Sequence, residues 1–268
     1  MRDTESDVPQ AERAASTVRV EDSDAILFDL DGVLTDTATV HERAWARMFA
    51  EFLGGRSGSP DPYTDTDYYT HIDGRPRLEG VRAVLRSRDI DLPEGREDDG
   101  PDRATIVGLG RRKNAVFAEL MRTEGVRPYP GSVALLDWLG DRSVPMAVVS
   151  SSRNAAAVLS AGGLRHRFEV VVDGAVASGR GLAGKPAPDT YLYAAALLGA
   201  APSRTTVVED AISGVRAGRA GGFRVTGVDR GVGRRDLFAN GADHVVDDLA
   251  ELIGPASSRP GPADREVP

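Results

Sequence analysis

Between positions 144 and 228 the chain alternates short apolar runs with longer stretches of helical spacing. The apolar runs are VPMAVVS, FEVVVDG, TTVVED and FRVTGVD, and segments such as NAAAVLSAGG and APDTYLYAAALLGA separate them. Short continuous apolar strands that alternate with helices are typical of a parallel sheet covered on both faces. The pattern therefore predicts an α/β fold with a doubly wound, Rossmann-like parallel sheet, and the earlier run AILF adds a strand to it.

The pattern changes between positions 37 and 126, where three stretches have helical spacing and none reads as a parallel strand. These stretches are residues 38–55, 78–90 and 111–125, while residues 57–76 fit no element clearly. We expect a helical cap domain at 37–126, inserted into an α/β core domain formed by residues 22–36 and 127–254. The polar segment 1–21 and the Pro-, Ser- and Gly-rich segment 255–268 are expected to be disordered tails.

Composition excludes several classes of partner and chemistry. A formal net charge of -8 gives no general attraction for nucleic acid or anionic lipid. No apolar run approaches the roughly 18 residues that a membrane-spanning helix needs. The chain contains no cysteine, so disulfides, thiolate metal sites and cysteine nucleophiles are excluded. We expect a cytoplasmic monomer that binds neither nucleic acid nor membranes.

Polar and charged residues follow several of the predicted strands. In open α/β sheets, ligands bind at the carboxyl ends of the strands, so these residues should share one edge. A lysine in the segment GKPAPD, ahead of two stiffening prolines, should reach the same edge. The groups expected there are Asp29, Asp31, Ser150, Lys185, Glu209 and Asp210.

Buried carboxylates cost several kcal/mol unless a cation or hydrogen-bond donors compensate them. Oxygen ligands suit a hard cation, and Mg²⁺ takes one or two carboxylates with waters and a phosphate oxygen. We expect Asp29, the main-chain carbonyl of Asp31, Asp210 and Glu209 to supply its ligands. Asp29 at the strand tip is the candidate nucleophile, forming an aspartyl phosphate, and Asp31 is the candidate general acid and base.

Ser150 and Lys185 are expected to hold the non-bridging oxygens of a transferred phosphoryl group. Ser151 is expected only to cap the following helix. Plainer interpretations exist for each motif. The DLDG segment could be a simple turn, the Glu209 and Asp210 pair could complement a helix dipole, and the lysine could be solvated in a loop.

The same residues carry a family resemblance. The segments DLDGVLTDT, the strand-terminal Ser150, GKPAPD and VVEDAISGV resemble, in order and context, the four motifs of the haloacid dehalogenase superfamily of Mg²⁺-dependent phosphotransferases. These motifs bracket nearly all of the predicted folded chain. An aspartate two positions after the nucleophile resembles the pattern of the superfamily's phosphatase and mutase branch. The inserted segment resembles the helical cap of the subclass with the smaller cap.

A sharper resemblance is to the β-phosphoglucomutase family, which interconverts β-glucose 1-phosphate and glucose 6-phosphate through a bound glucose 1,6-bisphosphate. It rests on the segments VHERAW, DGRPR, RRKN and SSSRN, the last with arginine where the family has lysine. An arginine fork and a lysine point charge are not interchangeable. The resemblance implies that Thr37 and His41 sense cap closure, and that the substrate is bound by Gly74, Arg75, Arg77, Lys113, Asn114, Ser152, Arg153 and Asn154.

For these cap residues, a solvated basic face is the rival interpretation. The resemblance implies a β-phosphoglucomutase that uses Mg²⁺, with glucose 1,6-bisphosphate as activator and intermediate and a small sugar phosphate as partner. One alternative is a sugar phosphate phosphatase on the same scaffold, which would let water reach phosphorylated Asp29. The second alternative is a noncatalytic module that senses a sugar phosphate.

Overall fold

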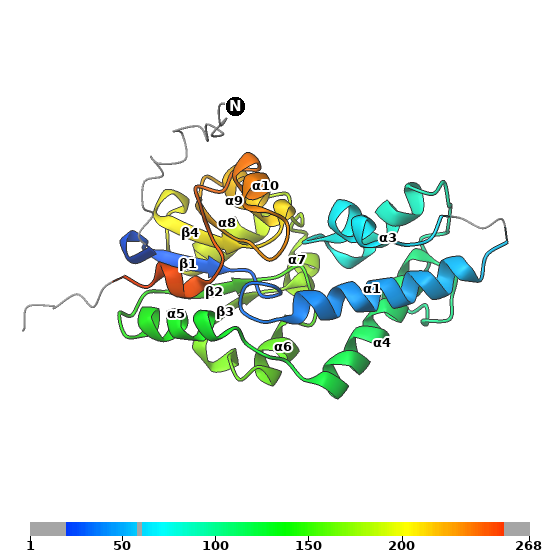
Figure 1. Cartoon of the computed structure of the whole chain (residues 1–268), viewed down its shortest axis with the longest axis horizontal. Coiled ribbons are helices and arrows are strands. Elements are labelled where there is room, and N and C mark those ends of the chain that lie inside the picture. The colour runs from blue at the N-terminus through cyan, green and yellow to red at the C-terminus, as the bar shows by residue number, and fades with distance from the viewer. Residues whose placement is uncertain (1–19, 58–60, 255–268) are drawn as a thin grey trace, which may run out of the picture.

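The computed structural model describes residues 20–57 and 61–254, and a six-stranded sheet forms its centre (Figure 1). Every neighbouring pair of strands runs parallel, in the order β3-β2-β1-β4-β5-β6. The strands are β1 (Ala25–Phe28), β2 (Met146–Val149), β3 (Val170–Val172), β4 (Thr205–Glu209), β5 (Arg224–Val228) and β6 (His244–Val246). Strand order reverses beside β1, so its carboxyl end opens into the crevice where such folds bind ligands.

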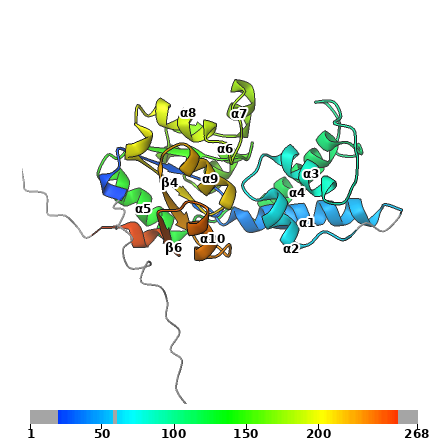
Figure 2. The same ribbon diagram turned by 90° about the horizontal axis from the view of Figure 1, so that it is seen from above.

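Helices cover both faces of the sheet, as Figures 1 and 2 show. Side chains on β1 alternate between two apolar clusters: Phe28 packs on one face and Leu27 on the other. The first cluster includes residues of α5 (Pro130–Gly140) and α6 (Ala155–Ala161). The second includes residues of α8 (Asp189–Leu197), α9 (Ile212–Ala220) and α10 (Arg234–Ala239). The predicted doubly wound α/β class is confirmed.

The segment 37–124, which we call the helical insertion, lies beyond one end of the sheet (Figure 1). It leaves the core after β1 and returns before β2. Trp45, Phe49 and Tyr63 stack inside a third apolar cluster that belongs to the insertion alone. Its elements are α1 (Thr37–Gly54), α2 (Asp65–Asp67), the π-helix η3 (Tyr68–Ile72), α3 (Arg77–Arg86) and α4 (Ile106–Glu124). The division into a cap domain at 37–126 stays a prediction.

Two chain passes connect the insertion to the core, and they are hydrogen-bonded to each other. The amide of Asp36 donates to the carbonyl of Arg127 at 3.0 Å, and the amide of Tyr129 donates to the carbonyl of Leu34 at 3.0 Å. Thr35 and Pro128 form an isolated antiparallel bridge. The outgoing and returning segments therefore run side by side at the boundary of the insertion.

Several elements differ from their predicted bounds. Helix α4 begins at Ile106 rather than at position 111, because the hydroxyl of Thr105 caps it by accepting from the amide of Gly108 at 3.0 Å. Helix α3 ends at Arg86 rather than at 90, since Asp89 adopts a left-handed φ of 51°. The unassigned segment 57–76 contains α2 and η3, although 58–60 lie outside the described residues.

Other elements were not predicted. Besides α5, they include the shorter elements α10, β6 and α7 (Gly174–Arg180), the last with its N-terminus capped by Asp173. Short helices η2 (Val20–Asp22), η4 (Arg165–Arg167), η5 (Pro202–Arg204) and η6 (Leu249–Leu252) complete the described chain. Val20 is buried, so the core begins slightly before the predicted boundary at 22. The predicted tails otherwise lie outside the described residues. Within the described ranges, no helix has the length and apolar character needed to cross a membrane.

Candidate active site

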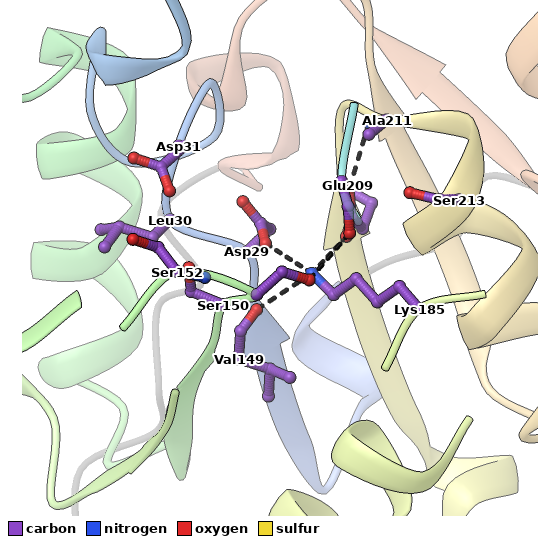
Figure 3. A network of polar contacts seen from close by, with 12 residues as sticks. Asp29, Leu30, Asp31, Val149, Ser150, Ser152, Lys185, Glu209, Ala211 and Ser213 are labelled. Atoms are coloured by element: carbon purple, nitrogen blue, oxygen red, sulfur yellow. Dashed lines mark hydrogen bonds and ion pairs between the residues drawn. The ribbon is translucent and has the colours of Figure 1, made fainter. Parts of the chain in front are cut away.

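Three adjacent strands bring the polar residues of the site together. Asp29 follows β1, Ser150 follows β2, and Glu209 ends β4, with Asp210 next in the chain. Because β2, β1 and β4 are neighbours in the sheet, their carboxyl ends form one edge. Lys185 reaches the same edge from the loop before α8, and Figure 3 shows its side chain running to Asp29 and Glu209.

A buried ion network holds Lys185 in place. Its ammonium donates to Asp29 Oδ1 at 2.5 Å, to Glu209 Oε1 at 2.6 Å and to the carbonyl of Val149 at 3.1 Å (Figure 3). These three bonds use the three ammonium hydrogens. Lys185 can therefore contact a phosphoryl oxygen, its predicted role, only by exchanging one of these partners.

Both carboxylate oxygens of Glu209 are engaged by protein groups in this structure, and its role as a metal ligand stays a prediction. Oε1 accepts from Lys185 and from the hydroxyl of Tyr191, at 2.6 and 2.8 Å, while Oε2 accepts from the amides of Asp210 and Ala211 at 3.0 and 3.1 Å. The side chain is only 1% exposed. With two hydrogen bonds at each oxygen, Glu209 anchors Lys185 and the turn after β4.

The Asp210 carboxylate has surroundings different from those of Glu209, which precedes it in the chain. It lies against the loop after β1, where a Cβ on Gly32 would stand 1.8 Å from Asp210 Oδ2. Gly32 also has a φ of +84°, so only glycine suits this turn and this close approach. Burial raises the pKa of Asp210 well above its usual range, and repulsion from Asp73, Glu209 and Asp29 adds to that shift.

Asp29 is also buried, and more carboxylates than cations lie around it. Burial raises its pKa to about 8; Lys185 opposes this rise, whereas Glu209 and Asp31 add to it. Burial likewise raises the pKa of Asp73 to about 7, with Glu209 and Glu42 adding to the shift. A single lysine does not compensate this cluster of carboxylates. The site needs further positive charge to keep Asp29 ionised at neutral pH.

A divalent cation fits that need. Asp29 and Asp210 offer only oxygen donors, the type that Mg²⁺ prefers. No three acidic or histidine side chains of residues 20–57 and 61–254 form a group that could hold a metal ion. Two carboxylates are nevertheless sufficient for Mg²⁺, which usually keeps several waters and binds a substrate phosphate oxygen. The assignment of Asp29, Asp210 and the Asp31 carbonyl as ligands stays a prediction.

Asp31 faces the insertion. The hydroxyl of Thr37 donates to Asp31 Oδ1, and His41 Nε2 lies 3.5 Å from the same oxygen. Burial opposes ionisation of Asp31, but His41, Thr37 and Lys113 together lower its pKa. Figure 3 shows its carboxylate pointing away from Lys185. Asp29 and Asp31 thus lie in opposite electrostatic surroundings, as different chemical roles require.

Lys113 is buried behind His41. Its ammonium contacts His41 Nδ1 and lies 4.7 Å from the ring centroid of Phe117 and 5.2 Å from that of Trp45. Burial lowers the pKa of Lys113 well below its usual range; nearby Arg77 contributes, and Asp31 opposes the shift. Burial and Lys113 lower the pKa of His41, while Asp31 opposes this. Residues of α1 and α4 therefore form one polar chain that ends at Asp31.

The turn after β2 is a second polar surface. The amide of Ser152 donates to Ser150 Oγ, and the amide of Asn154 donates to Ser152 Oγ, both at 3.1 Å. Asn154 Nδ2 donates to Asn114 Oδ1 of the insertion at 2.8 Å. The two asparagines, both predicted to bind substrate, therefore form a direct contact between the core and the insertion. Arg153 is exposed.

Arg77 begins α3 and faces the core. Its Nη1 donates to the carbonyl of Gly110 at 3.3 Å, and it forms no ion pair with any carboxylate of the described chain. Burial, Arg153 and Arg111 lower its pKa to about 10. A half-buried guanidinium that forms no ion pair with a described carboxylate is suited to binding an anion.

A small cavity of about 70 Å³ lies between these groups. It is well below the roughly 300–1,000 Å³ of typical ligand pockets. The insertion therefore packs closely over this part of the core edge, and we expect it to move away when a sugar phosphate enters the cavity.

The comparison with protein families decides the classification. Residues 23–222 match the haloacid dehalogenase-like hydrolase family. The chain belongs to this family.

Relatives within the haloacid dehalogenase-like family include both mutases and phosphatases. β-Phosphoglucomutase of Mycobacterium tuberculosis is 45% identical over 241 residues, covering 85% of this chain and 91% of the relative. Hexitol phosphatase A of Escherichia coli is 32% identical over 206 residues, covering 76% and 82%. A crystal structure of mutant CbbY from Rhodobacter sphaeroides with xylulose 1,5-bisphosphate has a TM-score of 0.67 and 26% identity, covering 85% and 96%.

Most predicted site residues of this haloacid dehalogenase-like chain line one cavity. Four lie just outside it: Lys185 beneath the carboxylates, Thr37 behind Asp31, Asn114 behind Asn154, and Arg153 in a neighbouring groove. The predicted residues that line the cavity are Asp29, Asp31, His41, Gly74, Arg75, Arg77, Lys113, Ser150, Ser152, Asn154, Glu209 and Asp210.

Sequence reasoning missed some residues at this site. Asp73 lines the cavity and directly precedes Gly74 in the DGRPR motif, so its position in the sequence was a usable signal. Tyr191, which supports Glu209, had no signal in sequence because an aromatic residue on a buried helix usually belongs to the core. Ser151, expected only to cap a helix, instead donates to the carbonyl of Gly74 at 2.7 Å.

Proposed function

We propose that this protein is a Mg²⁺-dependent β-phosphoglucomutase, which interconverts β-glucose 1-phosphate and glucose 6-phosphate. The reaction runs through an aspartyl phosphate on Asp29 and a glucose 1,6-bisphosphate intermediate. The 45% identical mycobacterial β-phosphoglucomutase, matched over most of both chains, supports the proposal. The proposed partner is the small sugar phosphate alone, bound by a cytoplasmic monomer.

The observation that carries the mutase assignment is the position of Arg77. It lines the same cavity as Asp29 but comes from the insertion, and no carboxylate of the described residues neutralises it. A bisphosphate intermediate has two phosphates and requires an anion site at each end. The edge with Asp29, Ser150 and Lys185 serves one phosphate, and Arg77 serves the other.

In the first half-reaction, the 6-hydroxyl of β-glucose 1-phosphate attacks the phosphorus of phosphorylated Asp29. Asp31 takes the hydroxyl proton, the bond between phosphorus and Asp29 breaks, and glucose 1,6-bisphosphate forms. Thr37 and His41 fix the position of the Asp31 carboxylate through contacts to Oδ1. Arg77 binds the phosphate at the other end of the sugar.

In the second half-reaction, the bisphosphate binds in the reverse orientation. Asp29 attacks the 1-phosphoryl group while Asp31 returns its proton to the departing 1-oxygen, which releases glucose 6-phosphate and restores the phosphoenzyme. Ser150 binds a non-bridging phosphoryl oxygen, and Lys185 does so after exchanging a present partner. A bound Mg²⁺ would offset the negative charge that accumulates between Asp29 and Asp210.

A sugar phosphate phosphatase is the second candidate, favoured by the relationship to hexitol phosphatase A. It would use Asp29 and Asp31 as in the second half-reaction: Asp29 attacks the substrate phosphoryl group, and Asp31 gives a proton to the departing sugar oxygen. Water, rather than a sugar hydroxyl, would then attack phosphorylated Asp29. The two candidates therefore differ in what reaches the phosphoenzyme, which depends on closure of the insertion.

The decisive experiment is phosphorus NMR of the purified protein with Mg²⁺ and β-glucose 1-phosphate. It is run with and without catalytic amounts of glucose 1,6-bisphosphate, and glucose 6-phosphate and inorganic phosphate are followed together. We expect bisphosphate-stimulated formation of glucose 6-phosphate with little inorganic phosphate. Inorganic phosphate as the main product would replace the mutase assignment with the phosphatase one. No Mg²⁺-dependent turnover of this or a generic phosphate ester would favour a noncatalytic sensor.

A further inference from the structure

The segment joining η3 to α3 contains a tight turn at Ile72–Arg75, which we call the docking turn. Asp73 has φ and ψ of -51° and 127°, and Gly74 has a φ of +67°. The amide of Arg75 donates to the carbonyl of Ile72 at 2.9 Å. These values describe a type II turn, which requires glycine at its third position. Arg77 follows the turn by two residues.

Two serines of the core bind the docking turn. Ser151 Oγ donates to the carbonyl of Gly74 at 2.7 Å, and Ser213 Oγ donates to the carbonyl of Asp73 at 3.0 Å. Ser151 follows β2 and Ser213 lies at the start of α9, which follows β4. Since β2 and β4 flank β1, the two serines hold the turn from either side of the strand that leads to Asp29.

We propose that Ser151 and Ser213 are positioning residues that hold the insertion closed and direct Arg77 toward the site proposed for the second phosphate. They need not touch the substrate, because each acts through a main-chain carbonyl of the docking turn. This inference extends the proposed function, since a closed insertion favours attack by a bound sugar hydroxyl over attack by water.

Close packing shows that the turn and the core are shaped for each other. A Cβ on Gly74 would lie 2.0 Å from Ser213 Oγ, so a larger residue would displace the turn or the serine. A Cβ on Gly184, next to Lys185, would lie 2.3 Å from Cγ of Pro76. The contact surface therefore includes the loop that carries Lys185 as well as the two serines.

The size of the cavity gives these bonds a role in the reaction cycle. A cavity of about 70 Å³ is smaller than typical ligand pockets, so we expect the insertion to separate from the core when a sugar phosphate enters. Separation breaks both serine bonds, and closure over the bound sugar forms them again. Each bond thus shifts the equilibrium between open and closed states without contacting the ligand.

The first test measures closure directly and needs no catalytic activity. Because the chain contains no cysteine, an Arg86→Cys and Ala175→Cys variant carries spin labels only at these exposed positions of α3 and α7. Pulsed EPR then gives the distance distribution without ligand. When both serines are kept, we expect a single peak at a short distance between the two spin labels. Adding Ser151→Ala and Ser213→Ala should raise the ratio of open to closed molecules about two- to tenfold per bond.

The second test follows the products. For each single serine-to-alanine variant, we expect the ratio of inorganic phosphate to glucose 6-phosphate to rise about two- to tenfold. The rate at which substrate phosphorylates Asp29 should change less. Ser151→Thr keeps the hydroxyl and should restore the original ratio. Ser160→Ala is the matched control, because it removes an exposed serine bond to the carbonyl of Ala156 within α6.

The outcomes separate the two proposals. Formation of glucose 6-phosphate with unchanged EPR distances and product ratios in the double serine variant would refute the positioning role alone. A protein that produces only inorganic phosphate would refute the mutase proposal, while the distance distribution would still decide the role of the serines. If Ser160→Ala raised the ratio of open to closed molecules as much as the serine variants of the docking contacts do, a specific role for the docking turn would also be refuted.

Discussion

The core edge and the insertion face contribute charged groups to the same cavity, but they hold them differently. At the core edge, Lys185 is bonded to Asp29 and Glu209, and Glu209 is fixed further by Tyr191 and two amides. On the insertion face, the one hydrogen bond of the Arg77 side chain to another described residue goes to the carbonyl of Gly110. The core thus has an excess of buried negative charge, and the insertion supplies in Arg77 a cation that forms no ion pair with a described carboxylate.

This difference separates reaction chemistry from substrate choice. Strand ends fix the core groups before any ligand arrives, which suits a nucleophile and its supporting charges. The insertion groups reach their positions only when the two parts meet through a few contacts such as Ser151 with Gly74. Changes at the core edge should therefore abolish every reaction, whereas changes on the insertion face should alter which reaction occurs.

The largest expected effect comes from Asp29→Asn. The amide cannot form an aspartyl phosphate, so both mutase and phosphatase turnover should fall by on the order of a thousandfold or more. Phosphorus NMR measures both products, and acid-quenched protein is assayed for bound phosphate. Circular dichroism should show an intact fold. Residual turnover near the original rate would mean that another group is the nucleophile.

Glu209→Gln should chiefly destabilise the protein. It removes one of the two buried negative partners of Lys185, and because Asp29 remains, the loss should be at most the roughly 3–5 kcal/mol of a fully broken buried pair. Denaturant unfolding measures the loss. Asp210→Asn is the matched comparison: it removes a like charge beside Asp29, so it should preserve the free energy of unfolding while weakening Mg²⁺ binding in calorimetry. The reverse pattern would show that Glu209 is the metal ligand.

Arg77→Ala should change the outcome of the reaction. Loss of a charged hydrogen-bonding group for the second phosphate should lower glucose 6-phosphate formation about 10- to 100-fold. Phosphorylation of Asp29 by a small phosphate donor should stay near its original rate. Arg86→Ala, at the exposed end of the same helix, is the control and should leave both rates unchanged. Equal losses in both reactions would assign Arg77 to the phosphoryl-transfer site.

The smallest expected effect is that of Thr105→Ala, far from the core edge. Removing the N-cap of α4 should lower the free energy of unfolding by about 1 kcal/mol. Thermal and denaturant unfolding measure the change, and Asp29 phosphorylation should be unaffected. A large loss of that phosphorylation would show that the insertion, as well as the core, controls the first chemical step.

The predictions from sequence were most successful where chemistry and pattern coincide. Asp29, Ser150 and Asp210 follow apolar strands, so the rule that ligands bind at strand ends was enough to predict that they line one cavity. The same rule could not separate the roles of Glu209 and Asp210, which are adjacent in sequence. Only the hydrogen bonds from Tyr191, Lys185 and two amides distinguish them.

Contacts between the insertion and the core could not be predicted from the sequence. Ser151 sits where a helix cap is expected, and its bond to Gly74 depends on how two parts of the fold meet. Short elements were missed for a different reason: β6 has only three residues, and α7 is rich in residues with weak helix propensity. Their stability comes from tertiary packing and from the Asp173 cap.

The paired connections at the base of the insertion limit its degrees of freedom. Because Asp36 is bonded to Arg127 and Leu34 to Tyr129, the start of α1 and the end of α4 stay together during any movement. The insertion can then rotate as a unit about this short two-stranded base, but it cannot twist by separating its two ends. Such a constraint reduces the number of orientations open to the insertion, so we expect each closure to return Arg77 to the cavity that Asp29 also lines.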